Sequence, residues 1–570
     1  MVTTFVNYSE LHSVPIEPTI PAECVASFGG VASFVLLAAL PIAILMTWAT
    51  VMLFRRSVLR VMSSLSAPRQ APNESSNNVS VSATPNRPLR IDYVSADASA
   101  AISSSLIERA HTHARQAGRA YAIAGIAHAL IATVLTFLFG DIEFLPVRIF
   151  AVAYLYAWPV VPTLMLTSIN NPRLKWLWLI GYFAIMFGFD FALSAFNLRT
   201  DPGGGSLFSI WLVWMGPPSL LLLILSNRAW RAVGLLAYFV AVALVAAWLL
   251  STQGIACLAL ALNDVGIWIQ YRWIVLGLLL FLFVGGAWWV LQRIATRYRR
   301  KLISDQSLIL GSWWLVITLV DIIIQFDATH GASVSLILSW IAYRWISAAL
   351  QPSPNAEESP PSLLLLRVFG YRRRSRRLLD QLSQRWRHIG PISLIGAPDL
   401  AVANLEPDEL MQFWGFRLRQ LFVATPQDLQ NKLAHFDNQP DPDGRYRVNE
   451  FYCYDNTWRD TVYALATQSS VVIMDLRGFG MNNQGCRFEL RMLLDSVPLP
   501  KILLLIDRST EKYRLEKLLQ NLWQALPNDS VNFRTSYPSI RIFEAAGSLH
   551  SVNALLNNIA SGNKVIPTLR

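Results

Sequence analysis

Apolar residues in the first 350 positions are gathered in long stretches that charged residues seldom interrupt. A helix needs about 20 apolar residues to cross the hydrocarbon core of a bilayer. Nine stretches approach that length, at 28–54, 120–140, 147–167, 176–196, 207–226, 232–251, 273–292, 307–325 and 331–350. The pattern predicts an α-helical membrane bundle of about nine spans over residues 28–350, preceded by an external segment at 1–27.

The pattern changes after residue 362, where short apolar runs alternate with amphipathic stretches. Five runs rich in Val, Ile and Leu predict strands, at 363–370, 392–396, 470–476, 501–507 and 539–545. Helical periodicity separates them, which is typical of a doubly wound parallel sheet that is covered on both faces. We therefore expect residues 363–570 to form a flavodoxin-like α/β domain with a five-stranded parallel sheet.

Two polar segments interrupt these patterns. Residues 61–98 are rich in Ser, Asn and Pro, which predicts a disordered loop. Residues 351–362 are rich in Pro, Ser and Glu and predict a short flexible linker between the bundle and the α/β domain.

Composition excludes a soluble globular enzyme of this size. Hydrophobic residues make up 53% of the chain and charged residues 15%, against about 25% charged in soluble domains. The net charge of +11 requires no nucleic-acid partner, because polytopic proteins collect Lys and Arg in their cytoplasmic loops.

The basic loops predict the orientation of the chain in the membrane. When the nine spans are threaded, the strongly basic loops fall on one side, at 55–60, 115–119, 173–175, 228–231 and 293–301. The positive-inside rule places that side in the cytoplasm. We expect a multi-pass protein of the cell (inner) membrane, with the N-terminus outside and the α/β domain in the cytoplasm.

Four ionisable residues lie within the predicted spans: His128, Asp190, Asp321 and Arg344. Such residues are functional candidates, because desolvating a charge in a bilayer costs about 2.5 kcal/mol or more. The alternative is structural, with Arg344 reaching toward the cytoplasm from near a helix end and the others satisfied inside the bundle.

The α/β pattern also predicts the location of a binding crevice. If the strand order is 2-1-3-4-5, a ligand binds at the carboxyl ends of strands one and three. The residues that follow these strands are Gly370, Tyr371, Arg372, Arg373, Asp475, Arg477, Gly478 and Phe479.

Two segments of this domain resemble a TIR (Toll/interleukin-1 receptor) domain. They are LLLLRVFGYRRRS at 363–375 and SSVVIMDLRGFGMNNQGCRFELRMLL at 469–494. The second resembles the third strand, loop and following helix of that family, and the matching positions are Gly485, Cys486, Phe488, Glu489 and Leu490. The resemblance implies a five-stranded flavodoxin-like fold, action as a homo-oligomer, and Glu489 in the place of the catalytic glutamate of NAD-cleaving members.

The chemistry that this implies for Glu489 is specific. Cleavage of the nicotinamide–ribose bond passes through an oxocarbenium-like species, which a nearby carboxylate stabilises. The alternative is that Glu489 is an ordinary residue near the start of a helix, favoured there by the helix dipole. Asp475 has two readings as well, since it can contact a ribose or cap its own loop.

An arginine cluster at 367–387 follows the last predicted span. Most of it is expected to contact anionic lipid headgroups, with one or two of its arginines at the crevice mouth. Arg372, Arg373, Arg374 or Arg477 could hold a pyrophosphate there. The sequence contains no P-loop or zinc spacing, so we expect no metal and no resident cofactor, with NAD entering only as a substrate.

The sequence as a whole predicts a membrane-anchored signalling or defence protein whose α/β domain binds and cleaves NAD or a related nucleotide. Its expected partners are the lipid bilayer and further copies of the chain. Two alternatives stay open: a non-catalytic interaction module on a membrane anchor, and a transporter or channel with a nucleotide-sensing domain.

Overall fold

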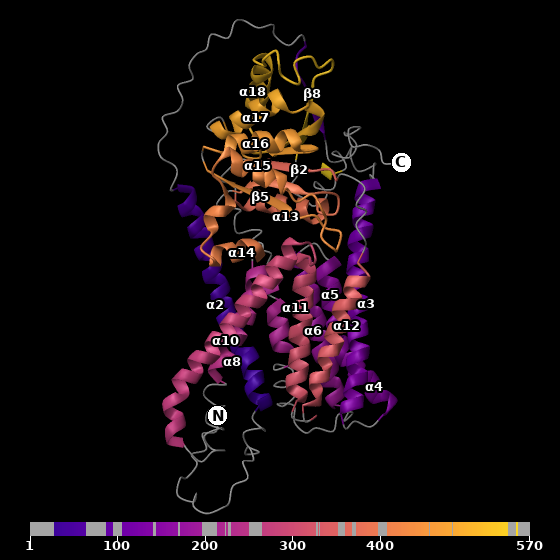
Figure 1. The fold of residues 1–570 in the computed structure, drawn as a ribbon. Helices are drawn as coiled ribbons and strands as arrows, with labels where there is room; N and C mark the ends of the chain where they lie inside the picture. The colour runs from indigo at the N-terminus through magenta and orange to yellow at the C-terminus, as the bar shows by residue number, and fades with distance from the viewer. Residues whose placement is uncertain are drawn as a thin grey trace, which may run out of the picture.

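The computed structural model describes residues 28–63, 87–94, 105–140, 144–168, 172–195, 214–222, 224–225, 230–249, 265–326, 329, 331–351, 360–367, 372–396, 407–454, 456–480, 483–544 and 555–556. The predicted external segment at 1–27 lies outside them. Figure 1 shows a helical bundle on one side and an α/β layer on the other.

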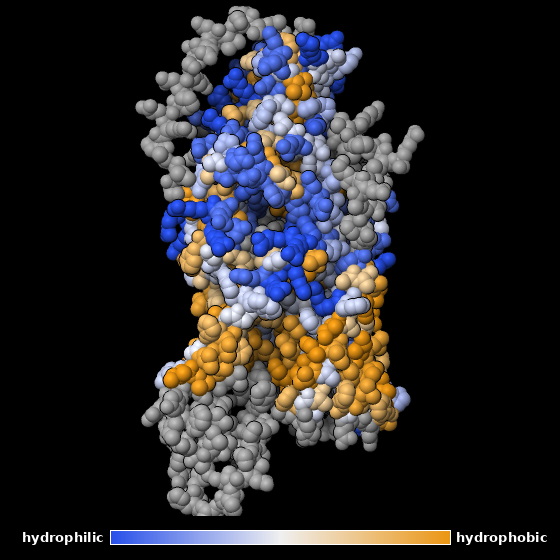
Figure 2. Space-filling model, viewed as in Figure 1, coloured by the Kyte–Doolittle hydropathy of each residue, from blue (hydrophilic) through white to orange (hydrophobic). Residues whose placement is uncertain are grey.

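Long helices make up the bundle. They are α2 (Phe28–Ser63), α3 (Ser105–Phe139), α4 (Pro146–Ala157), α5 (Val160–Ser168), α6 (Pro172–Ala195), α8 (Arg231–Leu249), α10 (Val265–Arg299), α11 (Asp305–Gln325), the 3-10 helix η2 (Ala332–Leu336) and α12 (Ile337–Ala349). Figure 2 shows apolar side chains gathered over this half and hydrophilic ones over the α/β half. Large side chains such as Phe150 and Phe281 are about three-quarters exposed there, at 73% and 75%, which is typical of a membrane-facing surface.

Six segments of the described chain are helical, long and apolar enough to cross a membrane. They are Phe34–Met62, Thr112–Phe139, Pro146–Ser168, Trp273–Arg299, Asp305–Gln325 and Ala332–Ala349. Two further predicted spans correspond to shorter apolar helices, Trp176–Gly188 and Val233–Leu249. The span predicted at 207–226 lies partly outside the described residues. The structure therefore supports six of the nine predicted spans at full length.

Helix α11 forms the centre of the bundle. Its Trp313 and Trp314 are fully buried, and the Trp314 ring stacks on Tyr343 of α12 at a centroid distance of 4.9 Å. A Cβ at Gly125 of α3 would lie 2.7 Å from the Trp314 ring. The absence of a side chain at Gly125 thus lets α3 and α11 approach closely.

The α/β half is built on an eight-stranded, entirely parallel sheet with the order β1-β8-β7-β6-β2-β3-β5-β4. Its strands are β1 (Arg90–Val94), β2 (Leu363–Arg367), β3 (Ile392–Gly396), β4 (Phe422–Val423), β5 (Val448–Cys453), β6 (Val471–Asp475), β7 (Ile502–Ile506) and β8 (Ser539–Glu544). The five predicted strands occur within it as β2, β3, β6, β7 and β8, and their relative order is the flavodoxin-like one.

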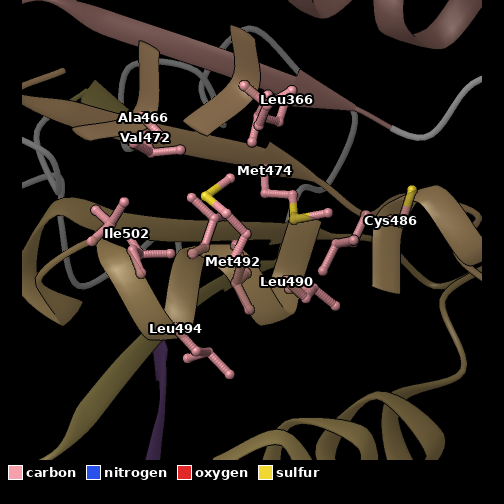
Figure 3. Close-up of a cluster of buried hydrophobic side chains, with 14 of the residues drawn as sticks. Leu366, Ala466, Val472, Met474, Cys486, Leu490, Met492, Leu494 and Ile502 are labelled. Carbon is pink, nitrogen blue, oxygen red and sulfur yellow. The ribbon is translucent and has the colours of Figure 1, made fainter. Parts of the chain in front are cut away.

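Helices cover both faces of the sheet, which explains why its central strands are apolar throughout. Leu363 and Leu365 of β2 pack toward α13 (Arg372–Trp386). The alternate residues Leu364 and Leu366 belong to the opposite face. That second face is covered by α16 (Trp458–Gln468), α17 (Gln484–Ser496) and α18 (Lys512–Gln524), and Figure 3 shows part of its buried cluster.

The expectation of five strands was wrong, because three further strands come from segments in which the sequence pattern predicts none. β4 and β5 arise between 397 and 455, together with α14 (Pro407–Trp414), the 3-10 helix η3 (Leu418–Leu421) and α15 (Pro426–Ala434). β1 comes from the segment predicted to be a disordered loop, 61–98, whose first residues also continue α2 to Ser63.

Strand β1 joins the loop between α2 and α3 to the far edge of the sheet. It pairs with β8 from Arg90↔Ser539 to Val94↔Phe543. The preceding Leu89 is buried, and its carbonyl accepts a hydrogen bond from the Gln520 side chain at 2.7 Å. A segment of the bundle therefore completes the sheet of the α/β half.

The bundle and the α/β half also meet in a direct junction, so the linker at 351–362 is not their sole connection. A shared buried cluster contains residues from α2, α8 and α10 on one side and from α14, η3, β4 and the end of β5 with the residue after it on the other: Phe54, Val58, Val233, Leu236, Leu291, Leu410, Leu418, Phe422, Tyr452 and Tyr454. This apolar contact fixes the α/β half against the bundle.

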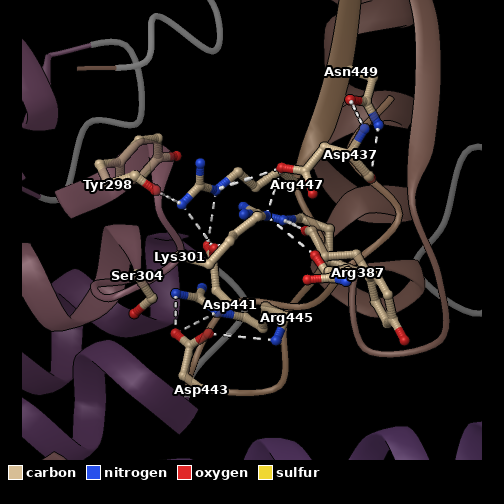
Figure 4. Close-up of polar contacts among 12 residues, drawn as sticks. Tyr298, Lys301, Ser304, Arg387, Asp437, Asp441, Asp443, Arg445, Arg447 and Asn449 are labelled. Carbon is tan, nitrogen blue, oxygen red and sulfur yellow. Dashed lines mark hydrogen bonds and ion pairs between the residues drawn. The ribbon is translucent and has the colours of Figure 1, made fainter. Parts of the chain in front are cut away.

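Charged residues complete the junction at the turn between α10 and α11 (Figure 4). Arg447 donates to the Tyr298 carbonyl at 2.6 Å, and its guanidinium lies 3.5 Å from the centre of the Tyr298 ring. It also pairs with Asp441 at 2.8 Å. Lys301 lies 2.5 Å from Asp437 and 3.3 Å from Asp441. These pairs join a turn of the bundle to the loop that precedes β5.

Candidate functional site

The strand order reverses at the carboxyl ends of β2 and β6, which is the place predicted for the crevice. The chain passes from β2 to β3 on one side, while β6 lies on the other side of β2. Connections that diverge in this way leave a gap above the carboxyl ends, where ligands of open α/β sheets bind. The last register pair of these strands is Arg367↔Asp475. Both side chains are buried, at 4% and 3% exposure.

Asp475 and Arg477 form a closed pair in the loop after β6. The Arg477 guanidinium donates to both carboxylate oxygens of Asp475, at 2.7 and 2.8 Å. Gly478 has a φ of +77°, which the tight turn between Leu476 and Phe479 requires. Phe479 is buried in the core below this turn. The predicted ligand residues of this loop thus stabilise the loop itself.

Glu489 lies on α17, the helix that follows this loop. Its side chain is 3% exposed, and its Oε2 atom has no hydrogen-bond partner among the described residues. Burial raises the pKa of Glu489 to about 8, and the guanidinium of Arg367 opposes part of that rise. A buried carboxyl group with an open oxygen and a raised pKa is typical of a functional position.

Cys486 lies one turn before Glu489 on the same helix. It is buried, and burial, together with the charge of Glu489, raises the pKa of its thiol to about 12. The thiol is therefore protonated at neutral pH and a poor nucleophile. Buried Cys453 is likewise a free thiol with a pKa raised by burial, to about 11.

Several predicted site residues lie where the structure gives no side-chain position. Gly370 and Tyr371 fall outside the described residues. Arg372 and Arg373 begin α13, but their side chains are not among those described.

Sequence reasoning missed the part that Arg367 plays. It assigned most of the arginine cluster to lipid contact, whereas Arg367 and Arg387 are buried in the α/β half. Arg387 donates to the Tyr446 carbonyl at 2.5 Å, and the charge of Arg367 acts on Glu489. The available signal was the position of Arg367 as the single charge at the carboxyl end of an otherwise apolar strand.

The intramembrane candidates are held by neighbouring helices. His128 Nε2 lies 3.0 Å from the Thr318 hydroxyl, and Trp214 donates to Asp321 at 2.5 Å. Arg344 donates to the Ser307 carbonyl at 2.8 Å, so it packs against α11. The side chain of Asp190 on α6 lies outside those described. Within the described part of the chain, no cluster of His, Cys, Asp and Glu is arranged to hold a metal ion.

Comparison with protein-family models, with curated proteins and with solved structures finds no match to this chain.

Proposed function

We propose that this chain is a membrane-anchored signalling or defence protein whose α/β half binds and cleaves NAD or a related nucleotide when copies assemble. The observation that carries the proposal is Glu489, buried on the helix that follows β6, with an open carboxyl oxygen and within the electrostatic influence of Arg367. The TIR-like pattern around Cys486 and Glu489 agrees with it.

The raised pKa of Glu489 fits a substrate that carries positive charge. Without a charged ligand beside it, this carboxyl group is largely protonated at neutral pH. A nicotinamide cation placed beside it would favour the carboxylate, because an opposite charge lowers the pKa of an acid. The carboxylate would then stabilise the positive charge that develops on the ribose as the nicotinamide leaves.

The position of basic residues supports the proposed orientation in the cell (inner) membrane. Arg56 and Arg60 lie on α2 where it approaches the α/β half, while Arg297, Arg299 and Lys301 lie at the turn that contacts it. The positive-inside rule places such ends in the cytoplasm. The N-terminus would then be outside and the α/β half in the cytoplasm.

The junction gives assembly a route to the crevice. Because a buried apolar cluster and ion pairs fix the α/β half to the bundle, contacts between bundles in the membrane would orient the crevices of neighbouring copies. We infer that the active form is a homo-oligomer.

The test is nicotinamide release from NAD by the full-length protein in detergent and in densely loaded proteoliposomes. Glu489→Gln keeps the shape of the side chain and should lower turnover by about 100-fold or more. Glu511→Gln, on an exposed residue that precedes α18, is the matched control and should turn over NAD like the wild type. Equal turnover by the wild type and Glu489→Gln would contradict the catalytic role.

Absence of turnover at every density would favour the non-catalytic interaction module. The closed Asp475–Arg477 pair and buried Phe479 are the observations that support that alternative. A solute or ion flux lost in Asp321→Asn but kept in Glu489→Gln would favour a transporter.

A further inference from the structure

One aromatic side chain of the α/β half, that of Phe416, is almost fully exposed to solvent. Phe416 lies between α14 and η3 and is 98% exposed. Its backbone has a φ of +57°, a left-handed conformation that bulky residues seldom adopt. Arg417 and Arg419 beside it are exposed as well. We name residues 415–419 the aromatic loop.

The aromatic loop lies at the level where α2 leaves the apolar part of the bundle. Phe413, three residues before Phe416, packs edge-on against Phe54 of α2, with ring centroids 5.4 Å apart. Phe54 is followed at once by Arg55 and Arg56. A switch from apolar to basic residues marks the end of a span on the cytoplasmic side.

Contacts with helix α10 independently place the aromatic loop at the same height relative to the membrane. Leu418 of the aromatic loop shares a buried cluster with Leu291 of α10. Near Leu291, Trp289 is 59% exposed, and the Arg293 guanidinium lies 5.1 Å from the centre of its ring. Exposed Trp beside Arg is typical of the boundary between acyl chains and headgroups.

The exposure of Phe416 does not benefit the isolated chain. Its left-handed backbone closes the carboxyl end of α14, because the Phe416 and Arg417 amides donate to the Phe413 and Gln412 carbonyls at 3.1 and 2.8 Å. Glycine or asparagine is usual at such a helix end, so the backbone does not require an exposed Phe there. A fully exposed phenyl ring gains nothing from water, whereas insertion at a bilayer surface removes it from water. Arg417 and Arg419, close to Phe416 in the chain, complement the negative charge of phosphate headgroups.

We propose that the aromatic loop binds anionic lipid, with Phe416 inserted at the headgroup–acyl boundary and Arg417 and Arg419 on headgroup phosphates. The occupant is the leaflet that surrounds the protein's own bundle, because the loop region packs against α2 and α10 where their apolar stretches give way to arginines. The anchor would hold the edge of the sheet formed by β4 and β5 against the membrane. It is independent of any nucleotide chemistry at Glu489.

The test places a bimane fluorophore at Phe416→Cys in full-length protein that also carries Cys24→Ser and Cys257→Ser. Cys453 and Cys486 are buried and should not react. The protein is reconstituted in phosphatidylcholine vesicles with and without phosphatidylglycerol, each with a lipid spin-labelled near its headgroup. Tyr513→Cys is the matched control, since Tyr513 is 76% exposed on α18, away from the junction.

We expect the label at 416 to be quenched by the spin-labelled lipid, and more strongly with phosphatidylglycerol, while the label at 513 is unaffected. Replacing Arg417 or Arg419 with Gln should each weaken insertion into the anionic vesicles about fivefold. Quenching at 416 no greater than at 513 would overturn the proposal. So would a signal that follows protein density instead of the spin label, since it would assign the loop to a second copy of the chain.

Discussion

Buried charges gather in two regions of the α/β half, and the two are satisfied differently. At the junction, Arg447 immediately precedes β5, while Arg367 and Asp475 end β2 and β6. Because the strands are parallel, the two regions lie near opposite ends of the strands. Each buried carboxylate of the junction loop has a guanidinium within 2.8 Å: Asp441 with Arg447 and Asp443 with Arg445. Glu489 near the crevice retains an unpartnered oxygen.

The pKa values of Asp443 and Glu489 differ in the same sense, although burial also raises the pKa of Asp441 against the opposing charges of Lys301 and Arg447. Burial alone would raise the pKa of Asp443, but Arg445 outweighs it and holds that pKa below its ordinary value. Burial raises the pKa of Glu489, and Arg367 does not offset it. Burial with a matched partner thus gives cohesion between the two halves. Burial without a matched partner, as at Glu489, leaves a carboxyl group whose protonation can change when a charged ligand binds.

The largest effect should come from breaking a pair of the junction. Arg445→Ala leaves the Asp443 carboxylate buried and without its guanidinium, which costs about 3–5 kcal/mol. Denaturant unfolding of the full-length protein in detergent, followed by tryptophan fluorescence, measures this loss. The double variant Arg445→Ala with Asp443→Asn removes the stranded charge and should recover part of it. A loss below about 1 kcal/mol would mean that water reaches the pair.

A smaller, pH-dependent effect is expected at the crevice. Between the ordinary pKa of 4.5 and the raised pKa of about 8, folded protein keeps a proton on Glu489 that unfolded protein has released. The stability of the wild type therefore falls as pH rises through this window. Glu489→Gln cannot ionise, so it should gain about 2 kcal/mol or more relative to the wild type between pH 5 and pH 8. A constant difference across that range would show that Glu489 is solvated or paired.

The central strands of the α/β half could be predicted from the sequence, because each is a short apolar run by itself. β2, β6 and β7 are apolar except for the final Arg367 and Asp475, because helices cover both faces of the sheet. β1 reads RIDYV and carries two charges in five residues, so no local pattern marks it. It is a strand because β8 offers an unpaired edge, which is a tertiary property.

The candidate site divides in the same way. The TIR-like pattern at 469–494 indicated Glu489 from the sequence. Its burial and its open carboxyl oxygen depend on how α17 packs, which no local pattern shows. The junction could not be predicted, because Tyr298 and Arg447 are joined by folding and lie in segments of unrelated pattern. The turn-rich stretch before β5 gives no local sign that its Asp and Arg residues would be buried.

The smallest effect tests whether burial, and not ion-pair geometry, separates these regions. Lys512 and Glu544 lie 2.8 Å apart, as Arg445 and Asp443 do, but their side chains are 43% and 41% exposed. Water screens an exposed pair, and ordering two long side chains costs entropy, so Glu544→Gln should cost less than about 1 kcal/mol. The loss should shrink further when salt is added. Unfolding under the conditions used for Arg445→Ala measures it. A loss as large as that of Arg445→Ala would make the short distance alone sufficient, and the contrast between the junction and the crevice would then need a cause other than burial.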